Sequence, residues 1–432
     1  MNFLDIIEKQ RTKKPLTKEE VEFAINQYVN DKIPDYQFAA FIMAININNI
    51  GLEQTYWLTN SMLHSGNTVD FSSIKGIKID KHSTGGVGDK VSVIIGPILA
   101  ACGLKVAKMS GPGLGHTGGT IDKLNSIGVN TNLTLQQCKK LLKDNGIFIA
   151  SQTDDIVPAD KKIYALRNAT STVDSLPLIA SSIASKKVAM GTDYIFIDVK
   201  VGDGGFCETY DKAFKLGKIL ISILKKFNRK SIVHITNMNQ PLGRSIGNCI
   251  EMKTTIEFLD GKPESKDVKE LIYEFSSDIL IATKICKNKK EAYENIDEVI
   301  NSKKALEVFK KWISSQHANA NEVCKNNFFK PKYSLEIKAD KSGYVKYKSA
   351  REVGMISFLL GAGREVKGAP IDFQAGVFLN KIINEKVNKG ETIATLYSSK
   401  KINSLLIEKF KKNILYSNSK FKELPVIVKV IK

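Results

Sequence analysis

The segment Asp80–Lys90, which reads DKHSTGGVGDK, combines residue types that suit an anion. Its glycines let the backbone turn tightly and approach a ligand, and successive N–H groups in such a turn form a concave anion site. Lys81 adds a positive charge, and Ser83 and Thr84 add hydroxyl donors. His82 is not needed to hold a phosphate, so it is the candidate for acid–base chemistry, or else a side chain that only orients the loop.

A second glycine-rich stretch, Ser110–Thr120, follows a predicted strand and adds further hydroxyl donors. Its glycines Gly113, Gly115 and Gly118 match the spacing of a dinucleotide-binding loop, which keeps a nicotinamide-dependent dehydrogenase open as an alternative. That fold also needs an acidic residue about 20 residues later, at the end of the next strand. The sequence offers glutamine and cysteine in a predicted helix there instead. A second site for the same anion explains the hydroxyls better.

A third set of polar candidates lies further along the chain, at Arg167, Ser182 and Lys186. Ser182 and Lys186 are four residues apart in a predicted helix and therefore share a face. From spacing alone, Lys186 would be a solvated side chain. The adjacent Lys187 does not help to decide between a solvated and a functional role. The histidines without polar companions are expected to be structural or at the surface; they are His64, His234 and His317.

The composition excludes several classes of protein. The chain has 432 residues, 43% of them hydrophobic, which is enough for large cores in two or three domains. Its six cysteines are scattered without a C-x-x-C pair, which argues against a disulfide framework or a zinc site and favours the cytoplasm. We expect no signal peptide and no membrane span. The net charge of +19 comes from lysines spread along the chain, which predicts a solvated surface rather than a specific nucleic-acid site.

The elements needed to position these residues follow a clear order. The first 65 residues are expected to be helical, with a capping box at Thr17–Glu20. A strand over Ile74–Asp80 should then feed the first glycine loop, and a buried helix should span Val91–Cys102. Strands and helices go on to alternate, which is typical of a mostly parallel sheet. Further strands are predicted at Leu104–Met109, Gly146–Ser151, Tyr194–Val199 and Ser231–Thr236.

The predicted fold class is α/β with a separate all-helical domain and a C-terminal α+β domain, around a mixed, mostly parallel central sheet. The helical domain comprises 1–66 and 160–192, two segments that are separated by part of the α/β domain. The α/β domain comprises 67–159 and 193–334, and a β-rich domain spans 335–432. Linkers near Gly66–Asp70 and Asp154–Asp160 would cross between the first two domains.

Several motifs together closely resemble the thymidine phosphorylase and pyrimidine-nucleoside phosphorylase family. The resemblance runs from residue 1 to about residue 400 without a large insertion. The two glycine loops are its most specific part. The motifs are DKHSTGGVGD at 80–89, SGxGLGHTGGTIDKL at 110–124, YALR at 164–167, TVDSLP at 172–177, DVKVG at 198–202, NQPLG at 239–243 and LLGAGREVKG at 359–368.

The resemblance implies reversible phosphorolysis of a pyrimidine nucleoside to free base and (deoxy)ribose 1-phosphate. It also implies a homodimer that closes a cleft between two domains, with phosphate as co-substrate, no metal and no other cofactor. Neither a specific nucleic acid nor a membrane is an expected partner. His82, Arg167, Ser182 and Lys186 match the family's base site, with His82, Arg167 and Lys186 as the catalytic groups. The matching phosphate ligands are Lys81, Ser83, Ser92, Lys108, Ser110 and Thr120.

Four positions depart from the pattern of this family. Pro112 stands where relatives commonly have arginine, and Asn168 replaces a common aspartate that would orient Arg167. Asp203 adds a negative charge to the loop at 202–207. Lys90 replaces a hydroxyl residue that helps bacterial relatives hold a monovalent cation, so we expect its ammonium group to occupy that position.

Substrate range depends on Lys108. The resemblance implies that thymidine-restricted relatives carry an apolar residue at this position, whereas relatives of broad range carry lysine. We therefore expect activity on uridine and deoxyuridine as well as thymidine, with a thymidine-restricted phosphorylase as the first alternative. An anthranilate-type phosphoribosyltransferase shares the architecture and the glycine loops and is a more distant alternative.

Overall fold

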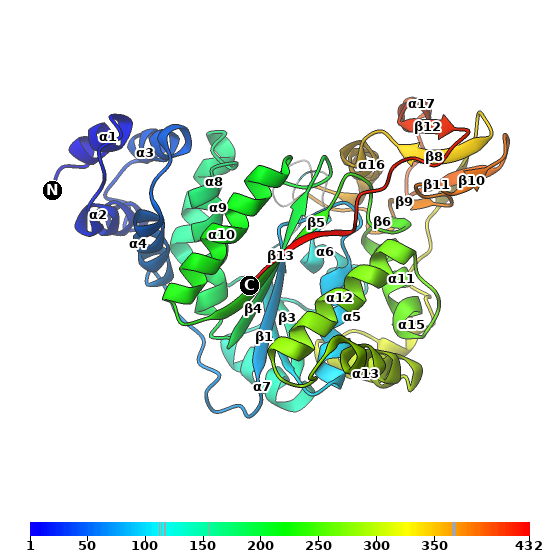
Figure 1. Ribbon diagram of the computed structural model, residues 1–432, viewed down its shortest axis with the longest axis horizontal. Coiled ribbons are helices and arrows are strands. Elements are labelled where there is room, and N and C mark those ends of the chain that lie inside the picture. Colours follow the sequence, from blue (N-terminus) through cyan, green and yellow to red (C-terminus); the bar gives the residue numbers. More distant parts are fainter. Residues whose placement is uncertain (112, 114, 116–117, 154, 365–368) are drawn as a thin grey trace.

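A six-stranded sheet forms the centre of the molecule (Figure 1). The computed structural model describes residues 1–111, 113, 115, 118–153, 155–364 and 369–432. The strand order is β13-β5-β4-β1-β2-β3; the first five strands in the chain run parallel and the last, β13, pairs antiparallel with β5. Their bounds are β1 Lys78–Ser83, β2 Lys105–Ser110, β3 Ile147–Ser151, β4 Tyr194–Val201, β5 Lys230–Asn237 and β13 Ile427–Ile431. The mixed, mostly parallel sheet is confirmed.

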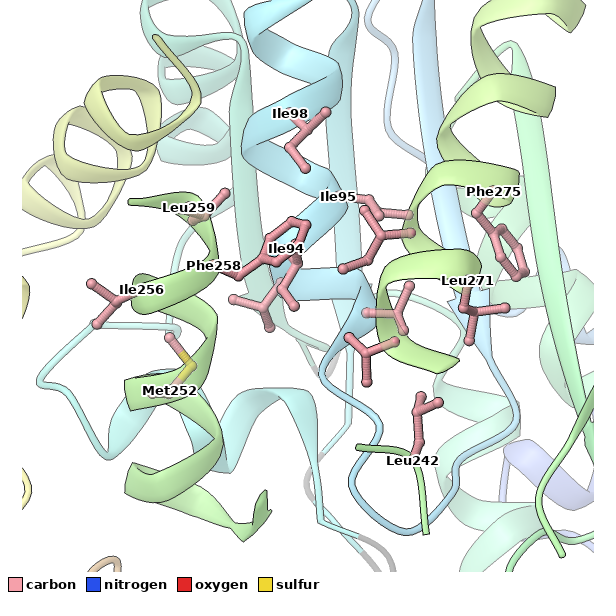
Figure 2. Packing of buried hydrophobic residues seen from close by; sticks show 14 of the residues in the cluster. Ile94, Ile95, Ile98, Leu242, Met252, Ile256, Phe258, Leu259, Leu271 and Phe275 are labelled. Carbon is pink, nitrogen blue, oxygen red and sulfur yellow. The ribbon is translucent and has the colours of Figure 1, made fainter. Parts of the chain in front are cut away.

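Two sets of helices cover the sheet. One face packs against α5, whose Ile94, Ile95 and Ile98 meet side chains of α11 and α12 in a continuous apolar core (Figure 2). The other face packs against α7, α9 and α10. The helices of this part are α5 Val91–Ala101, α6 Thr120–Asn125, α7 Leu135–Asn145, α10 Tyr210–Lys226, α11 Asn248–Leu259, α12 Lys266–Ala282, α13 Lys289–Asn301, α14 Lys304–Ser315 and α15 Ala320–Cys324.

A bundle of helices lies at one end of the molecule (Figure 1). The predicted capping box opens α2: Thr17 accepts from the N–H of Glu20, and Glu20 accepts from the N–H of Thr17. The later helices α8 and α9, which follow the first strands in the chain, also pack against α4. The helices are α1 Phe3–Arg11, α2 Lys18–Val29, α3 Asp35–Asn48, α4 Leu52–Leu63, α8 Pro158–Ala169 and α9 Leu176–Ala189.

Two small antiparallel sheets form the C-terminal part, with orders β10-β8-β12 and β6-β9-β11-β7. Strand β6 (Ser245–Gly247) belongs to the preceding α/β segment and pairs with β9. The other elements are β7 Tyr333–Lys338, β8 Gly343–Tyr347, α16 Ala350–Ser357, the π-helical turn η1 Phe358–Ala362, β9 Gly376–Leu379, β10 Lys386–Val387, β11 Thr392–Ser398, α17 Ser404–Lys412 and β12 Ile414–Ser417.

The structure differs from the sequence prediction at two places. Strand β1 begins at Lys78 rather than Ile74, because Gly76 has a φ of 100° and turns the chain before the strand. The last strand of the chain, β13, extends the central sheet instead of joining the C-terminal sheets. A short alternating strand carries no information about which sheet edge it will pair with. None of the helices in the described residues is long and apolar enough to cross a membrane.

Candidate active site

The first glycine loop begins where β1 ends, and β1 is the strand at which the strand order of the sheet reverses. The chain adds β2 and β3 on one side of β1 and then β4 and β5 on the other. In open parallel sheets, ligands bind outside the carboxyl ends of the strands at such a switch point. Thr84 fixes the loop to β4, because its N–H donates to the carbonyl of Asp198 and its hydroxyl accepts from the N–H of Lys200.

Strand alternation divides the residues of β1 between the two faces of the sheet. Successive side chains of a strand point to opposite faces. Lys81 pairs in register with Phe196, which belongs to the core on the α5 face, whereas His82 pairs with Ile197, which belongs to the core on the α9 face. The predicted phosphate lysine and the predicted base histidine are therefore adjacent in sequence and face opposite sides.

A buried network of charges surrounds the predicted phosphate ligands on the α5 face. The ammonium of Lys81 lies 3.1 Å from the Asp198 carboxylate, which also pairs with Lys200 at 2.8 Å and accepts from Thr236. The hydroxyl of Ser83 donates to Asp89 at 2.5 Å. These two predicted ligands are held by carboxylates that the sequence analysis did not select.

Electrostatics keep this network charged. Burial would raise the pKa of Asp89, but the ammonium groups of Lys200 and Lys81 outweigh it and hold that pKa well below its usual range. Burial would likewise lower the pKa of Lys200, but Asp198 and Asp89 raise it instead. The DVKVG motif contains both Asp198 and Lys200. Two charged residues with one residue between them share a face of a buried strand, and this was the signal that could have identified them.

Three further predicted phosphate ligands lie on separate elements near the two loops. Ser92 is in the first turn of α5, Ser110 ends β2, and Thr120 begins α6. Asp122, also in α6, accepts from the N–H of Gly113 at 2.6 Å and so fixes the second loop to this helix. Pro112, one of the departures from the family pattern, falls outside the described residues.

Three of the four predicted base ligands lie on α8 and α9. The ammonium of Lys186 donates to the hydroxyl of Ser182 at 3.0 Å and forms an ion pair with Asp160 at 2.5 Å. Lys186 is therefore not the solvated side chain that spacing alone suggested. Asp160 was missed, although Asp160, Tyr164 and Arg167 follow at helical spacing on one face of α8.

Arg167 is buried and has a structural role in addition to any contact with a base. Its guanidinium donates to the backbone carbonyls of Thr172, Val173 and Leu178 at 3.2, 2.7 and 3.1 Å. These bonds hold the turn between α8 and α9 in shape. Burial lowers the pKa of Arg167 from its usual value. Among the described residues, these bonds leave two of the five guanidinium N–H groups for a ligand.

Lys187 connects α9 to the central sheet. Its ammonium lies 2.7 Å from the buried carboxylate of Asp80 and 2.9 Å from the carbonyl of Met109. Adjacent residues on a helix point about 100° apart. Lys186 can therefore face the Asp160 cluster while Lys187 faces β1, a distinction that the sequence did not reveal.

Lys108 lies between the two groups of ligands. Its ammonium donates to the carbonyl of Lys81 at 2.7 Å and lies 3.9 Å from Asp80. Burial and the nearby charge of Lys187 lower the pKa of Lys108 to about 7. Its charge can therefore change at neutral pH.

His82 is neutral in this environment. Burial and four surrounding ammonium groups hold its pKa well below 6.5; the groups, in order of effect, belong to Lys187, Lys108, Lys186 and Lys81. One of these groups, Lys186, is a predicted base ligand on α9. A neutral imidazole can donate one N–H hydrogen bond, but it carries no extra proton to release.

The Lys90 side chain is fully buried beneath the first loop. Its ammonium lies 3.5 Å from each of the carbonyl oxygens of Gly88 and Leu242. A Cβ added to Gly243 would lie 2.9 Å from the same nitrogen. The cation therefore sits in a compact pocket of backbone from two loops.

The C-terminal part contacts the loop at 202–207 and helix α6. Asp203 accepts from the hydroxyl of Ser349 and the N–H of Arg351, so this departure from the family pattern caps helix α16. Arg364 forms an ion pair with Asp122 at 2.6 Å. No described residue records a contact that explains Asn168. Within the described ranges, no group of three or more His, Cys, Asp or Glu residues is placed to hold a metal ion.

Comparisons with known proteins agree with this arrangement along the whole chain. Residues 4–66, 75–306 and 344–417 match, respectively, the family models for a glycosyl transferase helical bundle domain, a glycosyl transferase a/b domain and a pyrimidine nucleoside phosphorylase C-terminal domain. Thymidine phosphorylase of Mycoplasmoides pirum is 48% identical over 419 residues, which cover 96% of this chain and 100% of the relative. The chain belongs to the thymidine phosphorylase and pyrimidine-nucleoside phosphorylase family.

Other relatives give the same result. Pyrimidine-nucleoside phosphorylases of Staphylococcus epidermidis and Geobacillus stearothermophilus are 44% and 42% identical, with 93% and 96% of both chains covered. The family relationship makes the protein a pentosyltransferase. Anthranilate phosphoribosyltransferase of Thermus thermophilus has a similar fold, with a TM-score of 0.60 at 13% identity over 72% of this chain and 99% of that one. At this identity the likeness concerns the fold alone.

The neutral state of His82 leads to a prediction about stability. The unfolded chain has a histidine pKa of about 6.5, and the folded value is lower, so only the unfolded chain takes up a proton just below pH 6.5. Stability should therefore fall as the pH falls below 6.5, by about 1.4 kcal/mol per pH unit for this group. Urea unfolding between pH 5 and 7.5 should show this extra loss in the wild type relative to His82→Gln. Parallel curves for the two proteins would contradict it.

Proposed function

We propose that the protein catalyses reversible phosphorolysis of pyrimidine nucleosides, giving free base and (deoxy)ribose 1-phosphate. The observation that carries this proposal is the division of β1 between two cationic clusters. Lys81 faces the glycine loops on one side of the sheet. His82 lies on the other face, where the Lys187–Asp80 ion pair holds α9 against the sheet, and α9 bears Ser182 and Lys186. One site can thus hold an inorganic anion and stabilise a second anion that forms during the reaction.

The chemistry explains why both clusters are needed. Phosphate attacks C1′ of the sugar while the bond to the base nitrogen breaks, and the transition state resembles an oxocarbenium ion. The bonding electrons leave with the pyrimidine, whose negative charge spreads onto its ring oxygens. Lys186 and the free N–H groups of Arg167 stabilise that charge, and Ser182 orients the base edge. The neutral imidazole of His82 donates a hydrogen bond to a ring oxygen.

Lys186 is held ready for this role by Asp160. Their contact keeps the ammonium beside Ser182, and Tyr164 lies below it with the ring centroid 5.9 Å from the nitrogen. A base that binds here meets a fixed cation rather than a mobile surface lysine. Preorganised charge of this kind acts in the transition state without further rearrangement.

Closure between the helical bundle and the sheet completes the reaction site in this proposal. The two linkers touch: the N–H of Asn67 donates to the carbonyl of Asp155 at 2.7 Å, and a Cβ on Gly66 would lie 2.4 Å from that same oxygen. Val157, a β-branched residue, has a φ of 51° at the start of α8. Such backbone can store strain at a hinge.

Stiffening these linkers is expected to lower turnover, and an unchanged kcat would argue against closure.

The substrate range in this proposal includes uridine and deoxyuridine in addition to thymidine. Lys108 supports it, because its ammonium lies on the carbonyl of Lys81 between the phosphate loop and the Asp80–Lys187 pair. A sugar hydroxyl in that space would meet a cation or, above pH about 7, a neutral amine that can also accept a hydrogen bond. An apolar side chain could do neither.

A homodimer is the proposed assembly, and the outer face of the helical bundle supports it. Tyr36 and Ile47 of α3 are 75% and 69% exposed, and Leu4 of α1 is 56% exposed, which leaves apolar surface uncovered at the end of the molecule. A solution mass of one chain in equilibrium sedimentation would contradict this.

The cytoplasm is the proposed compartment, in keeping with six free thiols, and phosphate is the only co-substrate proposed.

Release of free base from uridine and from thymidine in the presence of phosphate tests the activity. We expect His82→Ala and Lys186→Ala to lower kcat/KM by about 10²–10³-fold, because each removes a group that stabilises the leaving base. Lys108→Met should lower kcat/KM for uridine more than for thymidine. Failure to release base with phosphate, together with transfer of the phosphoribosyl group from 5-phosphoribosyl 1-pyrophosphate to an amine and release of pyrophosphate, would favour the phosphoribosyltransferase. Binding of NAD(H) would favour the dehydrogenase.

Lys90 is proposed to replace a bound monovalent cation. Its ammonium already lies among the carbonyls of Gly88 and Leu242. The wild type should therefore be equally active with potassium or with a bulky organic cation in the buffer. Lys90→Thr should lose activity by about tenfold in the organic cation and recover it with potassium. A wild-type enzyme that requires potassium, or a variant that does not respond to it, would contradict the replacement.

A further inference from the structure

The side chain of Lys123 in the short helix α6 is almost completely buried, with 1% of its surface exposed. Its ammonium donates to the carbonyl of Gly118 at 3.1 Å and to the carbonyl of Asp89 at 3.2 Å. It also forms an ion pair with Glu251 of α11 at 3.1 Å. Two of the three N–H donors of this lysine thus go to backbone carbonyls, and the Glu251 carboxylate balances its charge.

The partners of Lys123 belong to three separate segments. Gly118 lies in the second glycine loop, and Asp89 lies in the first. Glu251 is itself fixed, because its other carboxylate oxygen accepts from the N–H of Gly247 at 3.1 Å. One buried cation therefore joins the two loops to each other and to α11.

Packing alone does not require a charge at this position. Burying an ammonium group is costly unless it is paired, and an apolar side chain of similar length fills such a space at lower cost. The pair with Glu251 offsets the charge but does not explain the two contacts with loop carbonyls. Those contacts are what a lysine provides here and a methionine cannot.

Both loops lead directly to predicted phosphate ligands. Ser83 precedes Asp89 in the first loop and donates to its carboxylate. Thr120 lies on α6 itself, three residues before Lys123, and follows Gly118. A phosphate held by donors from both loops needs their separation to stay constant within about 0.5 Å. Lys123 is the side chain that links the two loops at their carbonyls.

We propose that Lys123 is a positioning residue that sets the distance between the two phosphate loops, acting through the carbonyls of Gly118 and Asp89. It contacts no substrate atom in this role. The inference rests on the proposed phosphorolysis, and it adds a residue that controls phosphate binding separately from base binding. The Lys186 cluster lies on α8 and α9 and shares none of these contacts.

The test compares Lys123→Met with the double variant Lys123→Met/Glu251→Gln. The single variant leaves the Glu251 carboxylate buried without its cation, which destabilises the fold. The double variant removes both charges, so it should recover stability while the link between the loops stays broken. We expect both variants to raise KM for phosphate by about 10–100-fold, with KM for the nucleoside within about twofold of the wild type.

Lys78→Met is the matched control. Lys78 also forms an ion pair, with Asp193 at 3.5 Å, but it lies at the start of β1, at the opposite end of the strand from the loop. The same substitution there should leave both KM values unchanged. Phosphate should also raise the melting temperature of the wild type and of Lys78→Met, and this increase should be lost in both Lys123 variants.

The outcomes separate the inference from the proposed function. A double variant with the wild-type KM for phosphate and the wild-type thermal response overturns the role of Lys123, and so does an equal change in both KM values. Failure of both variants to fold would make Lys123 a purely structural residue and would also overturn it. If the wild type releases no base with phosphate, the proposed function fails. The thermal response to phosphate then still decides the role of Lys123.

Discussion

Charge buried at the carboxyl end of a single strand is the constraint on which the rest of this structure depends. Asp80 and Lys81 are adjacent in β1, and the pleat sends them to opposite faces. Asp80 pairs with Lys187 and so holds α9, with its predicted base ligands, against the sheet. Lys81 pairs with Asp198 on the other face, among the groups that surround the glycine loops. One dipeptide thus fixes the positions of both halves of the site.

Most of the ionic groups around this strand are satisfied within the protein before any substrate binds. Lys81, Lys186 and Lys123 each have a carboxylate partner, and the hydroxyl of Ser83 has one as well. Breaking such buried pairs is costly, because it leaves an uncompensated charge. The partners therefore hold the cations in fixed positions rather than neutralise a surface. An incoming anion meets an environment that is already organised, which is the condition for strong electrostatic stabilisation.

The C-terminal part makes direct contacts with segments near the candidate site. Asp203 from the loop after β4 caps α16, and Arg364 reaches Asp122 in α6. The final strand β13 then returns to the edge of the central sheet beside β5. Two of these contacts thus lead to segments near the predicted phosphate ligands, and the third leads to the sheet that supports them.

The sequence by itself determined the fold class and the family, and it predicted the candidate site residues that lie within continuous motifs. Glycine spacing, the capping box at Thr17 and the hydrophobic runs act over a few residues, so they can be recognised without coordinates. Tertiary structure decided the pairing of charges. Asp160, Asp198 and Glu251 are ordinary acidic residues in sequence, and their partners lie 26, 117 and 128 residues away, at Lys186, Lys81 and Lys123. Whether Lys186 was solvated and Lys187 buried depended on which helix face met the sheet, because no local pattern records the position of a distant carboxylate.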